Sequence, residues 1–142
     1  MSKLLSTEDI RRLEAKIAAV ETMTSVEFKV IVCSHAWFGL KKKAHKLFLK
    51  YGLDKTRDRN AVLILMAEKD REFLIYGDKG IHEKVGELFW DSVKEDMLEL
   101  FKQNNIVGGL SLGLSLLAEI FVAHFPKTDE TNGLSNKIAF EK

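Results

Sequence analysis

Cysteine and proline each occur only once in this 142-residue sequence, as Cys33 and Pro126. A single cysteine excludes an internal disulfide bond, and chains of this kind are common in reducing compartments. The first residues, MSKLLSTEDIRR, are interrupted by charge too early to contain the apolar core of a secretion signal. We therefore expect a cytoplasmic protein.

Net charge is also nearly absent, because 22 basic and 21 acidic residues leave a formal charge of +1. This balance excludes a general electrostatic attraction to nucleic acid or membranes, so a charged partner has to meet a local patch. The lysine face of the helix expected at residues 38–51 is such a patch, but no aromatics are interleaved on that face and no glycine-rich loop accompanies it. We interpret these lysines as a solvated helix face and expect no nucleic-acid partner.

Long apolar segments are scarce, and one stretch, Ile106 to Ala123, needs to be tested as a membrane span. Its 18 residues include a single charge, Glu119, whose insertion into a bilayer costs about 2–3 kcal/mol. The leucines and Phe121 lie on one side of a helix, and small and polar residues lie along the other. We expect a buried helix that docks on a sheet, and no membrane insertion.

The most informative segment that is present runs from Arg59 to Ile81. Ala61 to Ala67 (AVLILMA) is an unbroken apolar run without alternation, which is typical of a strand that is buried on both faces. Glu72 to Tyr76 is a second strand-forming run, and a short charged connector joins the two. This pattern predicts an antiparallel hairpin whose first strand is central in a sheet covered by helices on each side.

The spacing of apolar residues predicts the other elements. Helices are expected near residues 6–20, 38–51, 82–102 and 106–123, and a further strand at residues 26–33. The helix at 82–102 is expected to bury Val85, Leu88 and Phe89 among its apolar residues. Strand 26–33, helix 38–51 and strand 61–67 form a βαβ unit, which implies parallel strands. The apolar patch at 138–140 either adds an edge strand or packs locally.

The chain length indicates one domain with one core. We place that domain at residues 1–126. Residues 127–142 are predicted to be a polar tail that packs on the domain or stays partly disordered.

The predicted topology brings three acids from separate segments to one end of the sheet. The two parallel strands begin there and the returning hairpin strand ends there, so Glu27, Asp58 and Asp78 converge. The side chains expected beside them are Thr56, Arg59 and Asn60. Clusters rich in oxygen suit hard cations such as calcium or magnesium, so we predict a divalent-cation site. The alternative is that Arg59 pairs with one acid and that the other residues are solvated loop ends.

Three further motifs are weaker candidates. Cys33, His35 and His45 are too few and too widely spaced for a typical zinc site, and a lone thiol at the end of a buried strand is usually a core residue. His82 falls in the first turn of a helix, where a positive charge is disfavoured. Gly77 to Gly80 opens a helix and is able to hold an anion, but it matches neither of the glycine-rich nucleotide-binding motifs.

Several of these segments resemble the TPM domain, a family named for a thylakoid-lumen protein, a photosystem II repair factor and a receptor modulator. The resemblance rests on the block RNAVLILMAEKDREFLIYGDKGIHEKV, the pair Phe89-Trp90, the stretch FKQNNIVGG and the ending HFP. Residues 24–27, TSVE, resemble the TSGE that opens the first strand of the family, with Val26 in place of glycine. The resemblance implies an α/β fold, a three-layer α/β/α sandwich around a small mixed sheet of about four strands.

What the resemblance implies about function is limited to two activities. Acid-phosphatase activity has been proposed for the plant branch of the family, and divalent-metal binding for several members. We therefore keep two hypotheses: a non-catalytic metal-binding interaction module with an unknown protein partner, and a metal-dependent acid phosphatase at the same acidic end of the sheet. The phosphatase hypothesis lacks a sequence signature. No DxD motif occurs, and a cysteine-based phosphatase needs arginine six residues after its nucleophile, whereas Gly39 is the sixth residue after Cys33.

Overall fold

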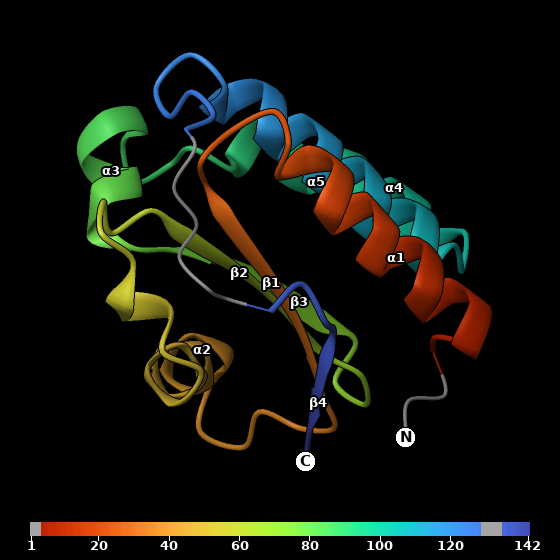
Figure 1. Ribbon diagram of the computed structural model, residues 1–142. Coiled ribbons are helices and arrows are strands. Elements are labelled where there is room, and N and C mark those ends of the chain that lie inside the picture. The colour runs from red at the N-terminus through yellow and green to blue at the C-terminus, as the bar shows by residue number, and fades with distance from the viewer. Residues whose placement is uncertain (1–3, 129–134) are drawn as a thin grey trace.

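The computed structural model describes residues 4–128 and 135–142. Within these residues the chain forms five α-helices, one short 3-10 helix and four β-strands (Figure 1). The helices are α1 (Thr7–Val20), α2 (Leu40–Lys50), α3 (Lys79–Val85), α4 (Asp91–Lys102) and α5 (Ile106–Phe121), and the 3-10 helix is η1 (Leu53–Lys55). The strands are β1 (Glu27–Cys33), β2 (Ala61–Ala67), β3 (Glu72–Gly77) and β4 (Ala139–Glu141).

The strands form one mixed sheet in the order β3-β2-β1-β4. β1 runs parallel to β2, from Glu27 opposite Ala61 to Cys33 opposite Ala67. β3 returns antiparallel to β2, so the predicted βαβ unit and hairpin are both confirmed. β4 pairs in parallel with the other side of β1, which makes the apolar patch near the C-terminus an edge strand. Residues 129–134 of the predicted tail lie outside the described residues.

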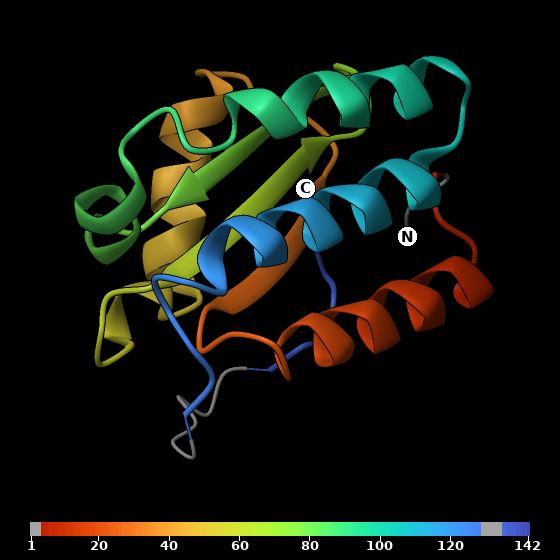
Figure 2. The same cartoon turned by 90° about the horizontal axis from the view of Figure 1, so that it is seen from above.

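Helices cover both faces of the sheet, as Figures 1 and 2 show: α1, α4 and α5 lie on one face and α2 lies on the other. Every residue of β2 is buried, because its side chains alternate between two cores. Val62, Ile64 and Met66 belong to the core beneath the three helices, and Leu63 and Leu65 belong to the core beneath α2. The unbroken apolar run is thus explained, and the expected α/β/α sandwich is confirmed.

The segment tested as a membrane span forms α5, which docks on the sheet face that it shares with α1 and α4. Its inward side chains are completely buried: Leu110, Leu114, Leu117 and Phe121. Close contact with α4 requires a small residue, since a Cβ atom on Gly109 would lie 2.3 Å from the Phe101 ring. In the part of the chain that the structure describes, no helix is long and apolar enough to cross a membrane.

The helix predicted for residues 82–102 is wrong as a single element, because the chain breaks it between α3 and α4. Gly86 adopts a φ of 87°, a left-handed conformation that ends α3. The break lets Phe89 turn into the core, where its ring lies 5.6 Å from that of Phe121. Leu88, which was expected to be buried, is instead exposed. The apolar spacing fits one helix, but the glycine and the demand of the core for Phe89 override it.

Candidate functional site at the loop end of the sheet

We call the end of the sheet where β1 and β2 begin and β3 ends the loop end, comprising residues 21–27, 56–60 and 78–80. The strand register brings these segments together as predicted. Glu27 donates its N–H to the carbonyl of Asn60 at 3.3 Å, and Asp78 donates its N–H to the carbonyl of Ala61 at 3.0 Å. The topology therefore places all three segments side by side, and the contacts of each side chain decide what they form.

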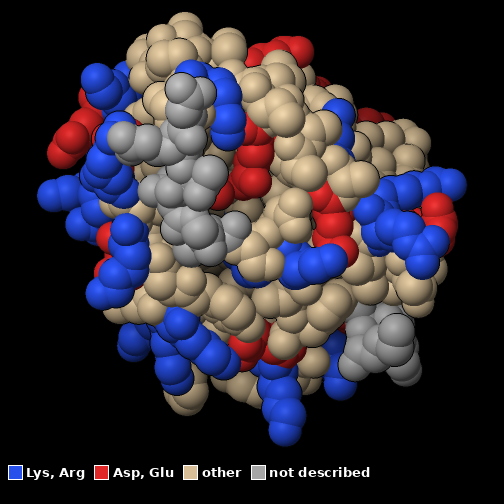
Figure 3. Space-filling view, viewed as in Figure 1, with Lys and Arg blue, Asp and Glu red and all other residues tan. Residues whose placement is uncertain are grey.

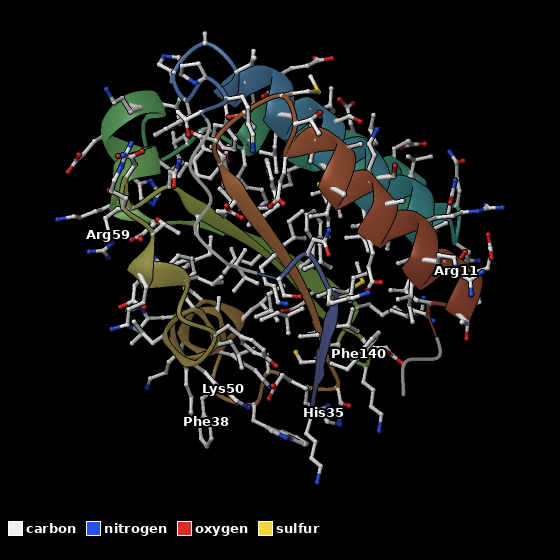
Figure 4. The ribbon with its side chains drawn as sticks, in the orientation of Figure 1. Arg11, His35, Phe38, Lys50, Arg59 and Phe140 are labelled. Carbon is white, nitrogen blue, oxygen red and sulfur yellow. The ribbon has the colours of Figure 1, made fainter. Side chains whose placement is uncertain are left out.

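Asp78 and Arg59 form the central ion pair of this end. Figure 4 labels Arg59, which lies at the end of the sheet near α3. The Nε of Arg59 donates to Oδ2 of Asp78 at 2.7 Å, and Nη2 donates to Oδ1 at 2.8 Å. Oδ1 also accepts the N–H of Lys79 at 2.8 Å, so Asp78 caps the start of α3. The hydrogen bonds to Asp78 raise the pKa of Arg59 above its ordinary value. Both oxygens of this buried carboxylate are therefore already engaged.

The loop before β2 packs tightly against the start of α3. Gly80 donates its N–H to the carbonyl of Arg59 at 2.9 Å. A Cβ atom at Gly80 would stand 2.2 Å from the carbonyl oxygen of Asp58 and 2.6 Å from that of Arg59. Thr56 closes the loop by accepting the N–H of Asn60 at 3.0 Å. The loop is thus fixed by its backbone, and only glycine fits at position 80.

Asp58 lies apart from Asp78. Its carboxylate pairs with Arg57 at 3.5 Å, and its side chain is nearly half exposed. It lines a shallow hollow of about 300 Å³ together with Glu83, Lys84 and His124. Asp58 therefore faces solvent and α3, not the ion pair of Arg59.

Glu27 contacts an acid that the sequence analysis missed, Glu21, the residue that ends α1. The Glu21 carboxylate accepts the N–H of Phe28 at 2.8 Å and makes a side-chain hydrogen bond with Glu27. Burial, together with the nearby charge of Glu27, raises the pKa of Glu21 from 4.5 to about 7, against the lowering effects of the Phe28 hydrogen bond and of Lys127. The carboxyl groups of Glu21 and Glu27 are therefore in contact at the loop end.

The predicted set of Glu27, Asp58 and Asp78 does not fit one cation as these side chains are placed. Each acid has a different neighbour: Glu21, Arg57 and Arg59, respectively. Across the described ranges, no group of three or more histidine, cysteine, aspartate or glutamate side chains is arranged to hold a metal ion. Asn60 does offer a free acceptor, since its buried Oδ1 accepts no hydrogen bond from the described residues.

The family model of the TPM domain matches residues 1–120. This chain belongs to the TPM domain family. No curated protein matches it.

Solved structures share this TPM fold. The NMR structure of the BA42 protein from the psychrophilic bacterium Bizionia argentinensis is 31% identical, with a TM-score of 0.91 over 99% of this chain and 97% of that one. The N-terminal domain of a P. gingivalis protein is 19% identical, with a TM-score of 0.73 over 90% of this chain and 83% of that one. The N-terminal domain of cg2496 from Corynebacterium glutamicum is 16% identical, with a TM-score of 0.62 over 89% and 79%. These last two likenesses concern the fold alone.

The cysteine and the two histidines of the weaker zinc candidate do not meet in this TPM domain. Cys33 is buried at the end of β1, and burial raises the pKa of its thiol. His35 lies 3.7 Å from Asp70 and stacks on Trp37, whereas His45 contacts the hydroxyl of Tyr76 at 2.8 Å. The expectation of a core thiol is confirmed.

Proposed function

We propose that this TPM domain is a non-catalytic interaction module that binds a divalent cation at the loop end, with the carboxyl groups of Glu21 and Glu27 as ligands. The observation that carries the proposal is the contact between these two acids. They come from different elements, the end of α1 and the start of β1, and both elements are fixed by the core. The core therefore fixes the backbone positions from which the two acids extend.

Two carboxylates in contact repel each other unless a proton or a cation lies between them. The raised pKa of Glu21 indicates that a proton fills this role near neutral pH. A divalent cation would replace the proton and join the end of α1 to the start of β1. Binding would therefore change the stability of this corner of the domain, which is a suitable basis for regulation of an interaction.

The number of carboxylates favours magnesium over calcium within the predicted pair of ions. Magnesium is usually held by one or two carboxylates and keeps several waters, whereas calcium takes six to eight oxygen ligands. The other two acids of the predicted cation site, Asp58 and Asp78, could join Glu27 as ligands only if Arg59 released Asp78. The proposal keeps Glu27 from that set and adds Glu21.

Thermal unfolding of metal-free protein during titration with magnesium, and then with calcium, tests the proposal. A cation that binds only the folded state stabilises it by about 2.7 kcal/mol when it is a hundredfold above its dissociation constant. Glu21→Gln and Glu27→Gln should each abolish the gain, and Asp58→Asn, the matched control, should keep it. A melting temperature that metal leaves unchanged, or a gain that survives both glutamine variants, would overturn the proposal. If Asp58→Asn and Asp78→Asn also abolished the rise in melting temperature, the originally predicted set of Glu27, Asp58 and Asp78 would be favoured.

The alternative function is a metal-dependent acid phosphatase at the same end, with Arg59 holding phosphate. Asp78 occupies the edge of the Arg59 guanidinium formed by Nε and Nη2, so that edge is not available to phosphate. Phosphate release from an aryl phosphate, with and without magnesium, separates the two functions. Release that depends on magnesium and on Glu27 would support the enzyme instead of the module.

We also propose a cytoplasmic location and a protein partner, neither of which the fold decides. The single buried cysteine is compatible with a reducing compartment. Fractionation of the native cells, followed by capture of bound proteins with and without magnesium, addresses both.

A further inference from the structure

The opposite end of the sheet exposes two neighbouring aromatic side chains. Trp37 and Phe38, in the loop between β1 and α2, are 79% and 88% exposed. Figure 4 shows Phe38 pointing away from the body of the domain beneath α2. Large aromatic side chains normally contribute to a core, so two of them standing in solvent together indicate a surface that is covered in use.

The outward face of α2 continues this surface. Phe38 precedes the helix and lines one hollow with Lys42 and Lys46. Within α2, helical spacing places Lys42 and Leu49 on one line. The buried residues of the helix lie opposite: Ala44, Leu47 and Phe48. Leu49 is half exposed, about 10 Å along the helix from Lys42. The outer face of a surface helix is usually polar throughout, but this one carries the exposed Leu49 beside its lysines, and the exposed Phe38 lies just before its first turn.

The loop that carries the aromatics is held in place. Asp70 accepts the N–H of Ala36 at 2.9 Å, and Lys43 donates to the carbonyl of His35 at 2.5 Å. The His35 ring lies 4.4 Å from that of Trp37. Trp37 is therefore presented on a fixed loop, which lowers the entropy lost when a partner covers it.

The charge on α2 itself is of one sign. α2 contains five lysines and no acid. Lys50 pairs with Glu141 at 2.9 Å and Lys43 is engaged by the loop, but Lys41, Lys42 and Lys46 have no ion pair with any described residue. Figure 3 shows lysine and arginine gathered over α2. We call Trp37, Phe38, Lys41, Lys42, Lys46 and Leu49 the aromatic–lysine surface.

We propose that the aromatic–lysine surface binds the headgroup layer of an anionic lipid bilayer, with α2 lying parallel to the membrane. Lysines are attracted to anionic headgroups, and tryptophan and phenylalanine are favoured at the boundary between headgroups and acyl chains. Phe38 stands out from the protein, so it enters a soft layer easily, whereas a folded partner would need a pocket of matching shape. This surface lies at the opposite end of the sheet from Glu21 and Glu27, and the proposal is independent of cation binding.

Vesicle flotation in the presence of a chelator tests the proposal without interference from bound cations. The two probes are vesicles of phosphatidylcholine alone and vesicles in which one third of the lipid is phosphatidylglycerol. We expect binding to the second and little binding to the first. Lys42→Gln with Lys46→Gln should weaken it by about twenty-five-fold, at roughly fivefold for each lysine. Trp37→Ser with Phe38→Ser should weaken it by roughly tenfold or more.

Matched controls lie elsewhere on the surface. Lys94→Gln with Lys102→Gln removes the same charge from α4, and Met23→Ser removes a partly exposed apolar side chain beyond α1. Both should bind like the unaltered protein. Membrane contact should also shift the tryptophan emission to shorter wavelength. Trp37→Ser should lose this shift, because the other tryptophan, Trp90, packs against the core and lies outside the aromatic–lysine surface.

Three results would overturn the proposal: absence of binding to either vesicle, equal binding to both, or equal weakening by the control variants. A synthetic peptide rich in glutamate and leucine serves as the competing probe. If this peptide bound the aromatic–lysine surface and vesicles did not, the partner would be an acidic protein segment and the membrane proposal would be wrong.

Discussion

Two pairs of side chains at the loop end use acids in opposite ways. Asp78 faces Arg59, and both of its oxygens accept hydrogen bonds from that guanidinium. Glu21 faces Glu27, so each acid meets a group of its own sign. The charges of the first pair are opposite and attract, whereas two ionised acids in the second pair repel each other unless a proton or a cation lies between them.

The difference shows that convergence of acids is not enough to define a cation site. An acid whose oxygens are occupied by an internal cation holds the fold together. Two acids in contact repel each other when both are ionised, so a proton or a cation between them is stabilising. The predictions below test this division, first by breaking the pair of opposite charges, then by disturbing the backbone that supports it, and finally by neutralising the pair of acids.

The largest effect is expected for Asp78→Ala. This change removes the ion pair with Arg59 and the cap of α3, and the Asp78 side chain is only 7% exposed. We expect a loss of about 3 kcal/mol in the free energy of unfolding, because a cation is left without its partner and a helix without its cap. Urea unfolding measures the loss. Asp58→Ala, which removes an exposed acid of the same loop, should change stability by no more than about 0.5 kcal/mol. Equal losses in the two variants would contradict the division.

A smaller loss is expected for Gly80→Ala. The added Cβ atom meets two backbone carbonyls of the loop before β2, and backbone cannot rotate away as a side chain can. We expect a loss of about 2 kcal/mol through displacement of the Arg59 loop. Lys79→Ala, one residue earlier and exposed, is the control and should leave the urea midpoint unchanged. A Gly80→Ala variant as stable as the control would show that the loop is free to shift.

The fold was largely predictable because its central strand is marked by the sequence. An apolar run of seven residues at Ala61–Ala67 requires cover on both faces, and the charged connector after it requires a hairpin. The break at Gly86 was not predictable from spacing, since the apolar residues on either side of it fit one helix. The packing of Phe89 against Phe121 decides it, and that contact joins residues far apart in the sequence.

The candidate site was predictable only to the level of segments. Topology placed Glu27, Arg59 and Asp78 at one end, because parallel strands begin together. It did not determine which acid each side chain would meet, since that depends on rotamers and on the neighbouring helix. Glu21 was not among the predicted site residues, because a charged residue at the end of a helix is ordinarily solvated. The approach of α1 to the start of β1 buries it, and the sequence contains no local signal of that approach.

The smallest effect is expected for Glu21→Gln, measured as the dependence of the melting temperature on pH in the presence of a chelator. The pKa of Glu21 is about 7 in the folded protein and near 4.5 for an ordinary glutamate. Between these values the folded state holds a proton that the unfolded state has lost, so stability falls as pH rises from about 4.5 to about 7. Glutamine cannot ionise, and its carbonyl can still accept the N–H of Phe28.

The variant should therefore lose this part of the pH dependence and be more stable than the unaltered protein at pH 8. Glu21 is partly solvated, so the difference should be about 1 kcal/mol or less, a change of roughly 3–5 °C in a chain of this size. Glu27→Gln should give a smaller change in the same direction, because burial rather than the charge of Glu27 is the main cause of the raised pKa. If Glu21→Gln and the unaltered protein lost stability equally between pH 5 and pH 8, the acid pair would not be the strained element of the loop end. The contrast with Arg59 and Asp78 would then rest on the salt bridge alone.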